Sequence, residues 1–349
     1  MPLTFHIVYV PGSVDYLLPF VDSLLHWSPY AFRLVSNGCS PAEQRLMRGY
    51  CRSDSRLEYL ALPTVEPLYH THVLNYLQAI CREDAFCFID SDIFACGPFL
   101  ENLESLRLEY AGVFAGAPFW LLPEDQVVPT HVNIATGEHS YTHVGLPLGT
   151  SFFAVYDNRL LTDFIRSTGL GFQICDWVNL PPWLQIWCAE RGMAGYWFDT
   201  GKALNLGLQA HGCNLVVLDS PNLFHLGGIS FIAKRRYFDM QKSRALLLGG
   251  LYYRARELYI SLRRRMRNDP VFRSARLPFL RRRRRYGPYF ADLLEAEMNG
   301  RQPPPLPAEE HPLIRRQAQF ATEEIPRLLR HFVSQRVLWE KDDCGESAA

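Results

Sequence analysis

The first hundred residues alternate short apolar runs with longer amphipathic stretches. The apolar runs have the length of strands and the stretches between them the length of helices, a pattern typical of βαβ units and a mostly parallel sheet. The expected strands are 6–10, 32–35, 57–62 and 86–89, and the expected helices are 14–27, one from residue 41 onward, and 72–82. Ser40, Pro41 and Glu43 have the spacing of a capping box, which predicts that the second helix begins at Pro41.

The pattern is looser beyond residue 100. Further strands are expected at 112–117, 151–156 and 215–218, and further helices at 179–191 and 201–211. From about residue 233 the composition changes to an Arg-rich helical region with a Pro-rich break at 303–307. The chain is therefore predicted to be an α/β domain over 1–232, followed by a basic α-helical C-terminal extension over 233–349.

Composition narrows the class of protein. The chain has 349 residues, of which 48% are hydrophobic and 21% charged, which fits a folded protein and argues against extended disorder. No run approaches the ~20 apolar residues that a membrane-spanning helix requires, and the N-terminus lacks the pattern of a secretory signal. The nine cysteines have no zinc-ligand spacing, so we expect reduced thiols and a cytoplasmic location.

An acidic tripeptide, Asp90-Ser91-Asp92, directly follows the expected strand 86–89. In open α/β sheets, ligands bind beyond the carboxyl ends of the strands. Two carboxylates at such an edge can hold a divalent cation that bridges the phosphates of a nucleoside diphosphate. The same residues also suit a capped loop after a buried strand, so the motif alone does not assign a function.

The chain between residues 4 and 230 resembles the GT-A glycosyltransferases, particularly their family-2-like branch. The resemblance is carried by the strand that runs into Asp90-Ser91-Asp92, by Asn75 fifteen residues before Asp90, and by Gly212, a strand and then His225. It implies a GT-A fold, that is, a Rossmann-like, mostly parallel sheet flanked by helices. It also implies a nucleotide-sugar half at 1–110, an acceptor half at 111–232, and transfer of a sugar from a nucleotide-diphosphate donor.

The resemblance implies roles for single residues. Asp92 would be a carboxylate ligand of the metal, Asp90 would contact the donor ribose or the metal, and His225 would be a second metal ligand. Manganese is favoured over magnesium because imidazole is a poor ligand for magnesium. The donor-binding residues implied are Pro11, Asn37, Asn75, Asp90 and Ser91. Asn37 replaces an Asp of the family and could pair with a pyrimidine edge, and a uridine-diphosphate sugar is favoured as the commonest donor.

An inverting transferase also requires a carboxylate that removes the proton of the acceptor hydroxyl. Two residues are candidates for this base. Asp199 precedes the helix that leads to Gly212 and resembles an acidic element of the family, with a spacing about two residues short. Asp176, next to Trp177, is the second candidate. Both also suit helix caps, and a retaining enzyme has no such fixed requirement, so the choice stays open.

Basic residues concentrate in one segment. Residues 231–285 contain 18 of the 36 Lys/Arg but only 3 of the 36 Asp/Glu. An apolar stripe at helical spacing accompanies them: Leu248, Tyr252, Ala255, Tyr259, Leu262 and Met266. Such a helix suits an anionic membrane surface, and hence a peripheral protein with a lipid-linked or cell-envelope acceptor. It equally suits packing on the acidic remainder of the chain. We expect Arg281–Arg285 to lie outside the donor site.

Three other classes stay open at this point. A metal-dependent nucleotidyltransferase or phosphotransferase would use the same acidic loop but gives no role to the distant His225. A nucleic-acid-binding protein would use the basic segment, although no known module is apparent. A GT-A domain that has lost its activity and serves as a scaffold would not be expected to keep Asp90, Asp92 and His225 together.

Overall fold

The computed structural model describes residues 3–99, 101–245, 258–259, 262 and 277–343. Its first part confirms the expected alternation: β1 Thr4–Tyr9, α1 Val14–Leu17, α2 Phe20–Trp27, β2 Ala31–Ser36, α3 Pro41–Cys51, β3 Leu57–Ala61, α4 His70–Ile80 and β4 Ala85–Ile89. The predicted helix 14–27 is wrong in one respect: α1 ends at Leu17 and α2 begins at Phe20, because Pro19 between them has no backbone N–H to continue the helical hydrogen bonds. The capping box of Ser40 and Glu43 is present, and α3 begins at Pro41.

The later part contains the remaining elements. They are β5 Ile93–Ala95, α5 Leu103–Glu109, β6 Gly112–Ala115, a 3-10 turn Pro123–Gln126, β7 Ile134–Ala135, β8 Phe153–Asp157, α6 Asn158–Thr168, β9 Cys175–Asp176, a 3-10 turn Trp177–Asn179, α7 Pro182–Ala189, β10 Trp197–Phe198, α8 Lys202–Ala210, β11 Leu215–Val217, β12 Leu223–His225, α9 Ile229–Ala245, α12 Phe279–Met298 and α13 Pro312–Asp343. The elements that the sequence pattern did not predict include the short strands β5 and β12 and the helices α5 and α6.

The central sheet has seven strands in the order β11-β6-β8-β4-β1-β2-β3. All neighbours in it are parallel except β8, which runs antiparallel to both β4 and β6. The chain builds β1, β2 and β3 in one direction and then returns to the other side of β1 to place β4. This reversal makes the carboxyl ends of β1 and β4 a topological switch point, where open α/β sheets bind ligands.

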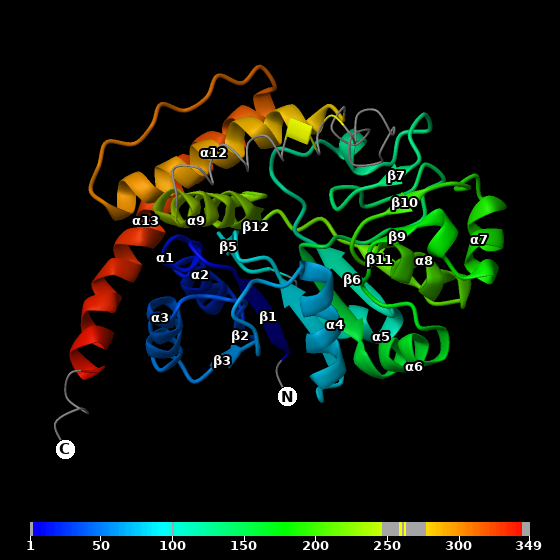
Figure 1. The fold of residues 1–349 in the computed structure, drawn as a ribbon, viewed down its shortest axis with the longest axis horizontal. Helices are drawn as coiled ribbons and strands as arrows, with labels where there is room; N and C mark the ends of the chain where they lie inside the picture. Colours follow the sequence, from blue (N-terminus) through cyan, green and yellow to red (C-terminus); the bar gives the residue numbers. More distant parts are fainter. Residues whose placement is uncertain (1–2, 100, 246–257, 260–261, 263–276, 344–349) are drawn as a thin grey trace.

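Each face of the sheet is covered by helices, and the strands show this in their side chains. In β4, Cys87 and Ile89 belong to a core that also contains residues of α1, α2 and α3, whereas Phe86 and Phe88 belong to a second core with α4, α6 and α8. Alternate residues of a strand point to opposite faces, so a wholly apolar strand such as β4 is buried on both. The fold is therefore mixed α/β with a mostly parallel sheet flanked by helices (Figure 1).

The C-terminal helices share the core of the first half. Tyr286 and Phe290 of α12 and Ile325 of α13 are buried in the same cluster as Phe5 of β1. Figure 1 shows α12 beside α9 and α13 descending past α2 and α3, and these helices are in contact. The proposed boundary after residue 232 falls inside α9, and the Pro-rich break is a non-helical stretch between α12 and α13.

The basic segment is only partly described. Leu248, Tyr252, Ala255 and Met266 of the expected stripe lie outside the described residues, while Tyr259 and Leu262 are exposed. No helix in the described ranges is long and apolar enough to cross a membrane. The eight cysteines of the described part are free thiols.

A buried lysine fixes the loop that borders the sheet edge. The ammonium of Lys202, at the start of α8, donates to the carbonyl oxygens of His139 at 2.6 Å, Gly149 at 2.5 Å and Gly137 at 3.3 Å. Burial lowers the pKa of Lys202 to about 7, against the opposing charges of Asp199 and Glu138. Three carbonyls at one nitrogen match the three donors of an ammonium group, so Lys202 holds residues 137–149 against α8.

Candidate metal centre and donor site

The acidic loop and His225 are brought together by a short antiparallel strand pair. Asp90 follows the last residue of β4, and Asp92 immediately precedes β5. β12 pairs with β5 so that His225 lies opposite Ile93, the residue after Asp92. This pairing places three potential ligands at the switch point of the sheet, although 133 residues separate Asp92 from His225.

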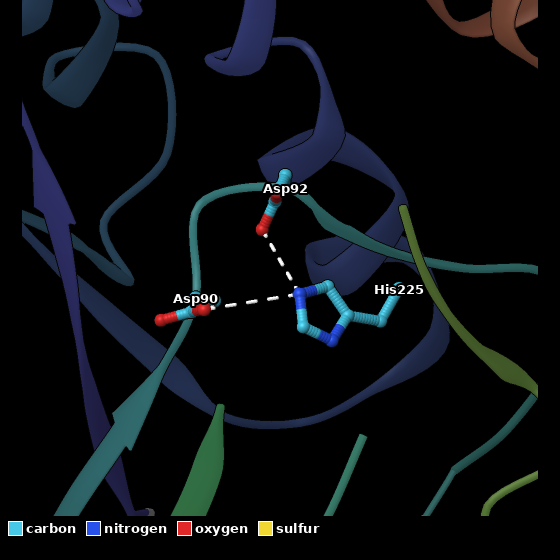
Figure 2. Close-up of side chains that lie close together, drawn as sticks. All are labelled: Asp90, Asp92 and His225. Carbon is cyan, nitrogen blue, oxygen red and sulfur yellow. Dashed lines mark hydrogen bonds and ion pairs between the residues drawn. The ribbon is translucent and has the colours of Figure 1, made fainter. Parts of the chain in front are cut away.

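The three side chains point toward one another (Figure 2). The Nε2 atom of His225 lies 3.1 Å from Oδ1 of Asp92 and 3.8 Å from Oδ2 of Asp90. One ligand atom from each residue lies within 4.8 Å of the others, and this is a group that could hold a metal ion. Asp92 and His225 are 1% exposed and the Asp90 side chain is 30% exposed, so the cluster opens to solvent on the Asp90 side.

Hydrogen bonds around His225 determine which ring nitrogen faces the carboxylates. Its Nδ1 lies 2.7 Å from the carbonyl oxygen of Gly116. A carbonyl can only accept, so Nδ1 carries a proton and donates it. In the neutral ring, Nε2 then has a lone pair that faces the Asp92 carboxylate at 3.1 Å. Two such electron-rich atoms repel each other, so the contact requires either a proton on Nε2 or a metal ion between them.

The electrostatics agree with this geometry. Burial, reinforced by the neighbouring charge of Asp92, raises the pKa of Asp90 to about 8. Burial acts in the same direction on Asp92, but the facing imidazole outweighs it and lowers the pKa of that carboxyl. Burial acts to lower the pKa of His225, but the Asp92 carboxylate outweighs burial, so the pKa of His225 is raised. The three groups thus compete for protons, and two carboxylates with one imidazole are a donor set suited to manganese.

Asp92 is also tied to the helix that follows His225. The backbone N–H of Ile229, the first residue of α9, donates to Oδ2 of Asp92 at 2.9 Å. Gly227 and Gly228 precede it with positive φ angles of 76° and 94°, which L-amino acids with side chains rarely adopt. The two glycines therefore allow the chain to turn from His225 into a helix whose N-terminus faces the acidic loop.

The donor-binding residues implied by the resemblance have other partners in this structure. The side-chain amide of Asn37 accepts from the N–H of Leu68 and donates to its carbonyl, so Asn37 holds the 63–69 segment. Asn75 accepts from the N–H of Phe172. Pro11 is buried, and a side chain at the next residue, Gly12, would meet α9. Ser91 is buried between the two aspartates. Their roles in donor binding stay predictions.

The two candidate bases lie in different settings. Asp199 is half-buried and accepts from the N–H groups of Gly137 at 3.0 Å and Thr200 at 2.8 Å. Gly137 is close to Phe152, whose ring centroid lies 4.6 Å from that of His225, so Gly137 and Phe152 lie in turn between Asp199 and the cluster. Asp176 is exposed on β9, opposite Trp197 of β10.

Arg283 lies near the candidate metal site, and the sequence analysis did not predict this. This residue belongs to the run Arg281–Arg285, which we expect to lie outside the donor site, and a Cβ atom on Gly228 would lie 3.2 Å from its Nε. Its charge also acts on Asp90, where it opposes the rise in pKa. Arg283 is 58 positions beyond His225, and only the opposite charges of the basic segment and the remaining chain hinted at such a contact.

Comparisons with known proteins give weak likenesses only. No protein-family model matches the chain, and no curated protein matches it. Among solved structures, it is similar to the glycosyltransferase GlyE of Streptococcus pneumoniae TIGR4, with 12% identity over 62% of this chain and 45% of that one, and a TM-score of 0.35. It is similar to the galactosyltransferase LgtC in complex with donor and acceptor sugar analogues, with 12% identity over 62% and 73%, and a TM-score of 0.38.

A third similar structure is TarS of S. aureus, with 13% identity over 47% of this chain and 30% of that one, and a TM-score of 0.32. The chain spans less than half the length of the GlyE and TarS chains. GlyE and LgtC are glycosyltransferases by name. At these TM-scores the likenesses carry no argument, and function is inferred below from the geometry of Asp90, Asp92 and His225.

Replacing Asp92 by Asn should remove metal binding without unfolding the protein. The change removes one carboxylate charge, while an amide oxygen can still accept from Ile229. We expect Mn²⁺ affinity to fall at least ~100-fold, since even outer-shell partners of a metal are typically worth 10–100-fold. Titration calorimetry with Mn²⁺ measures this, and Asp176→Asn, an exposed carboxylate, is the control. Unchanged Mn²⁺ affinity in Asp92→Asn would show that the cluster is not a metal site.

Proposed function

We propose that this protein is a metal-dependent glycosyltransferase that moves a sugar from a nucleoside-diphosphate donor to an acceptor hydroxyl group. The observation that carries the proposal is the convergence of Asp90, Asp92 and His225 at the carboxyl end of β4. This edge is the topological switch point of the sheet, the usual place for a nucleotide in an open α/β fold. The histidine favours manganese over magnesium.

The three residues of the cluster would have two different roles: two would hold the metal ion, and the third would face the donor. A bound divalent cation supplies positive charge that stabilises the departing diphosphate without a proton transfer. Asp92 and His225 are almost fully buried and would fix its position, since Gly116 orients the imidazole and Ile229 orients the carboxylate. Asp90 is the exposed member and faces the side from which a donor would enter.

A uridine-diphosphate sugar is the favoured donor and a carbohydrate or lipid-linked glycan the favoured acceptor. For the acceptor base, we favour Asp199 over Asp176. Gly137 and Phe152 connect Asp199 to His225. A carboxylate has about four lone-pair sites, so the two backbone contacts of Asp199 leave room for a hydroxyl proton.

Two alternatives fit fewer observations. A nucleotidyltransferase or phosphotransferase would use Asp90 and Asp92 in the same way, but would give no reason for a distant histidine to face them. A nucleic-acid-binding protein would use the arginines of the basic segment, of which Arg282 and Arg285 are paired with Asp125 and Glu309, and it would give no role to the acidic loop.

Incubation with a panel of nucleotide sugars tests the proposal. We expect slow, Mn²⁺-dependent hydrolysis of at least one of them, with release of the nucleoside diphosphate and inhibition by EDTA. The same donor should stabilise the protein by about 2.7 kcal/mol at 100 times its dissociation constant. Release of pyrophosphate or of a nucleoside monophosphate would favour the alternative enzymes. Neither hydrolysis nor stabilisation with any nucleotide sugar would remove support for the transferase.

Asp199→Asn should lower turnover of the complete reaction by at least ~100-fold, the typical contribution of a general base, with donor affinity unchanged. The base acts on the acceptor and not on the diphosphate. Asp176→Asn is the matched comparison, because Asp176 pairs with Trp197, two residues before Asp199. Its turnover should be close to that of the wild type. A loss confined to Asp176→Asn would transfer the role to that residue, and full activity in both variants would favour a retaining mechanism.

An anionic membrane surface is proposed as the setting of the reaction. Exposed apolar side chains occur on and after α9: Phe231, Met240, Leu258, Tyr259 and Leu262. Apolar contact together with nearby basic residues is the combination that peripheral membrane binding uses. Among the run of five arginines, Arg281 and Arg284 are exposed and make no ion pair with a described residue.

Replacing Arg281 and Arg284 together by Gln should reduce co-sedimentation with phosphatidylserine vesicles, and the binding should weaken as salt rises because exposed charges are screened over about 8 Å. Arg316→Gln with Arg330→Gln, two exposed arginines of α13, is the control. If the wild-type protein ignores these vesicles at low salt but binds RNA, the membrane setting is wrong.

A further inference from the structure

The first half of α12 is anchored to the loops beside the metal cluster. Arg282 donates to the carbonyl oxygen of Trp120 at 2.9 Å and pairs with Asp125 at 2.7 Å. The Asp125 side chain is only 8% exposed, and Phe279 and Tyr286 of the same helix are buried in the main core. These contacts set the helix position, and therefore the position of Arg283, independently of any ligand.

Arg283 extends from this helix to the turn between His225 and α9. Its guanidinium would be 3.2 Å from a Cβ atom on Gly228, so it lies against the backbone there. The next residue, Ile229, donates its N–H to Asp92. Arg283 is therefore next to the residue that bonds a proposed metal ligand. Glycine at 228 is favoured by its φ of 94°, and a Cβ atom there would also press on the guanidinium.

One carboxylate holds Arg283 and leaves most of its donors free. Nη1 pairs with Glu138 at 2.8 Å, and the Glu138 side chain is 9% exposed. No described residue accepts from Nε or Nη2, and the Arg283 side chain is 38% exposed. An arginine has five N–H donors in a planar fork that matches phosphate oxygens. Glu138 therefore positions the guanidinium while one edge stays available.

The charges of the site require such a group. A divalent cation held by Asp90 and Asp92 would be neutralised by the two carboxylates. A nucleoside diphosphate that departs from a sugar carries additional negative charge, which needs a second positive group. Arg283 is a permanent cation next to this cluster, and it makes charge-assisted hydrogen bonds to phosphate oxygens where a hydrated lysine would act only as a point charge.

We propose that Arg283, presented by the C-terminal helix α12 and positioned by Glu138, is a diphosphate-binding residue of the donor site. The proposal rests on the proposed function and adds to it a role for the C-terminal helices, which would complete the donor site. Arg283 differs in this from Arg282 and Arg285, whose pairs with Asp125 and Glu309 only join parts of the chain.

The test measures binding of UDP, GDP and ADP in the presence of Mn²⁺ by titration calorimetry, with Mn²⁺ alone measured separately. Arg283→Gln should weaken the best of these ligands by about 10- to 100-fold, as expected for loss of charge-assisted hydrogen bonds. Affinity for Mn²⁺ alone should stay within about threefold of wild type. Arg283→Lys should recover part of the loss, which a packing role alone would not predict. Arg284→Gln, an exposed neighbour on the same helix, is the matched control.

Loss of Arg283 leaves Glu138 buried without its partner, so the variant could be unstable. Arg283→Gln combined with Glu138→Gln avoids this and should show the same loss of diphosphate affinity. Wild-type affinity in a folded Arg283→Gln or double variant overturns the inference. If Asp92→Asn then still loses binding, the proposed function stands without it. If wild-type protein binds none of the three nucleotides with Mn²⁺, the proposed function fails, and the role of Arg283 with it.

Discussion

The antiparallel pairing of β5 with β12 is the contact on which the metal cluster depends. It sets His225 opposite Ile93 and thus beside Asp92. Aromatic packing fixes this pair, because Phe224 stacks on both Phe94 and Phe119 with ring centroids 5.2 Å apart. Such aromatic pairs contribute about 0.5–1.5 kcal/mol each beyond the burial of their area. The position of His225 is thus fixed by the core on one side of the acidic loop, together with the hydrogen bond from the N–H of Leu226 to the carbonyl oxygen of Asp92 at 3.1 Å.

The same turn connects the cluster to the C-terminal helices. α9 begins at Ile229, whose N–H bonds Asp92, and α12 packs beside α9 and sends Arg283 to Gly228. α13 returns to the first half of the chain, where Phe332 contacts Tyr50 of α3 with ring centroids 6.0 Å apart. The described part of the Arg-rich extension is therefore joined to the first half of the chain by a common core. Among its described arginines, Arg282 and Arg285 form ion pairs within the chain, and Arg283 lies near the acidic loop.

The sequence predicted what is encoded locally. The alternation up to residue 89 gave β1 to β4 and their helices, because apolar runs and the capping box at Ser40 act within a few residues. The break at Pro19 was missed although proline marks it. β5 and β12 have three residues each and no periodic pattern, so only their mutual pairing identifies them.

Only those site residues could be predicted that belong to motifs shared with the GT-A glycosyltransferases. The resemblance placed His225 near Asp90 and Asp92, and the structure brings the three together. It could not show that the amide of Asn37 is hydrogen-bonded to Leu68, because a tertiary contact between residues 31 positions apart produces no recognisable motif in the sequence. Arg283 was hidden for the same reason: one arginine in a run of five is distinguished only by the Glu138 that faces it.

The central claim is that Asp90, Asp92 and His225 hold a metal ion that binds the diphosphate of the donor. Anomalous diffraction at the manganese edge, from crystals grown with Mn²⁺ and UDP, tests this directly. The account predicts an anomalous peak between the three side chains, with the phosphates of UDP on its open side next to Asp90. Manganese or UDP bound elsewhere, with His225 still hydrogen-bonded to Asp92 alone, would contradict it.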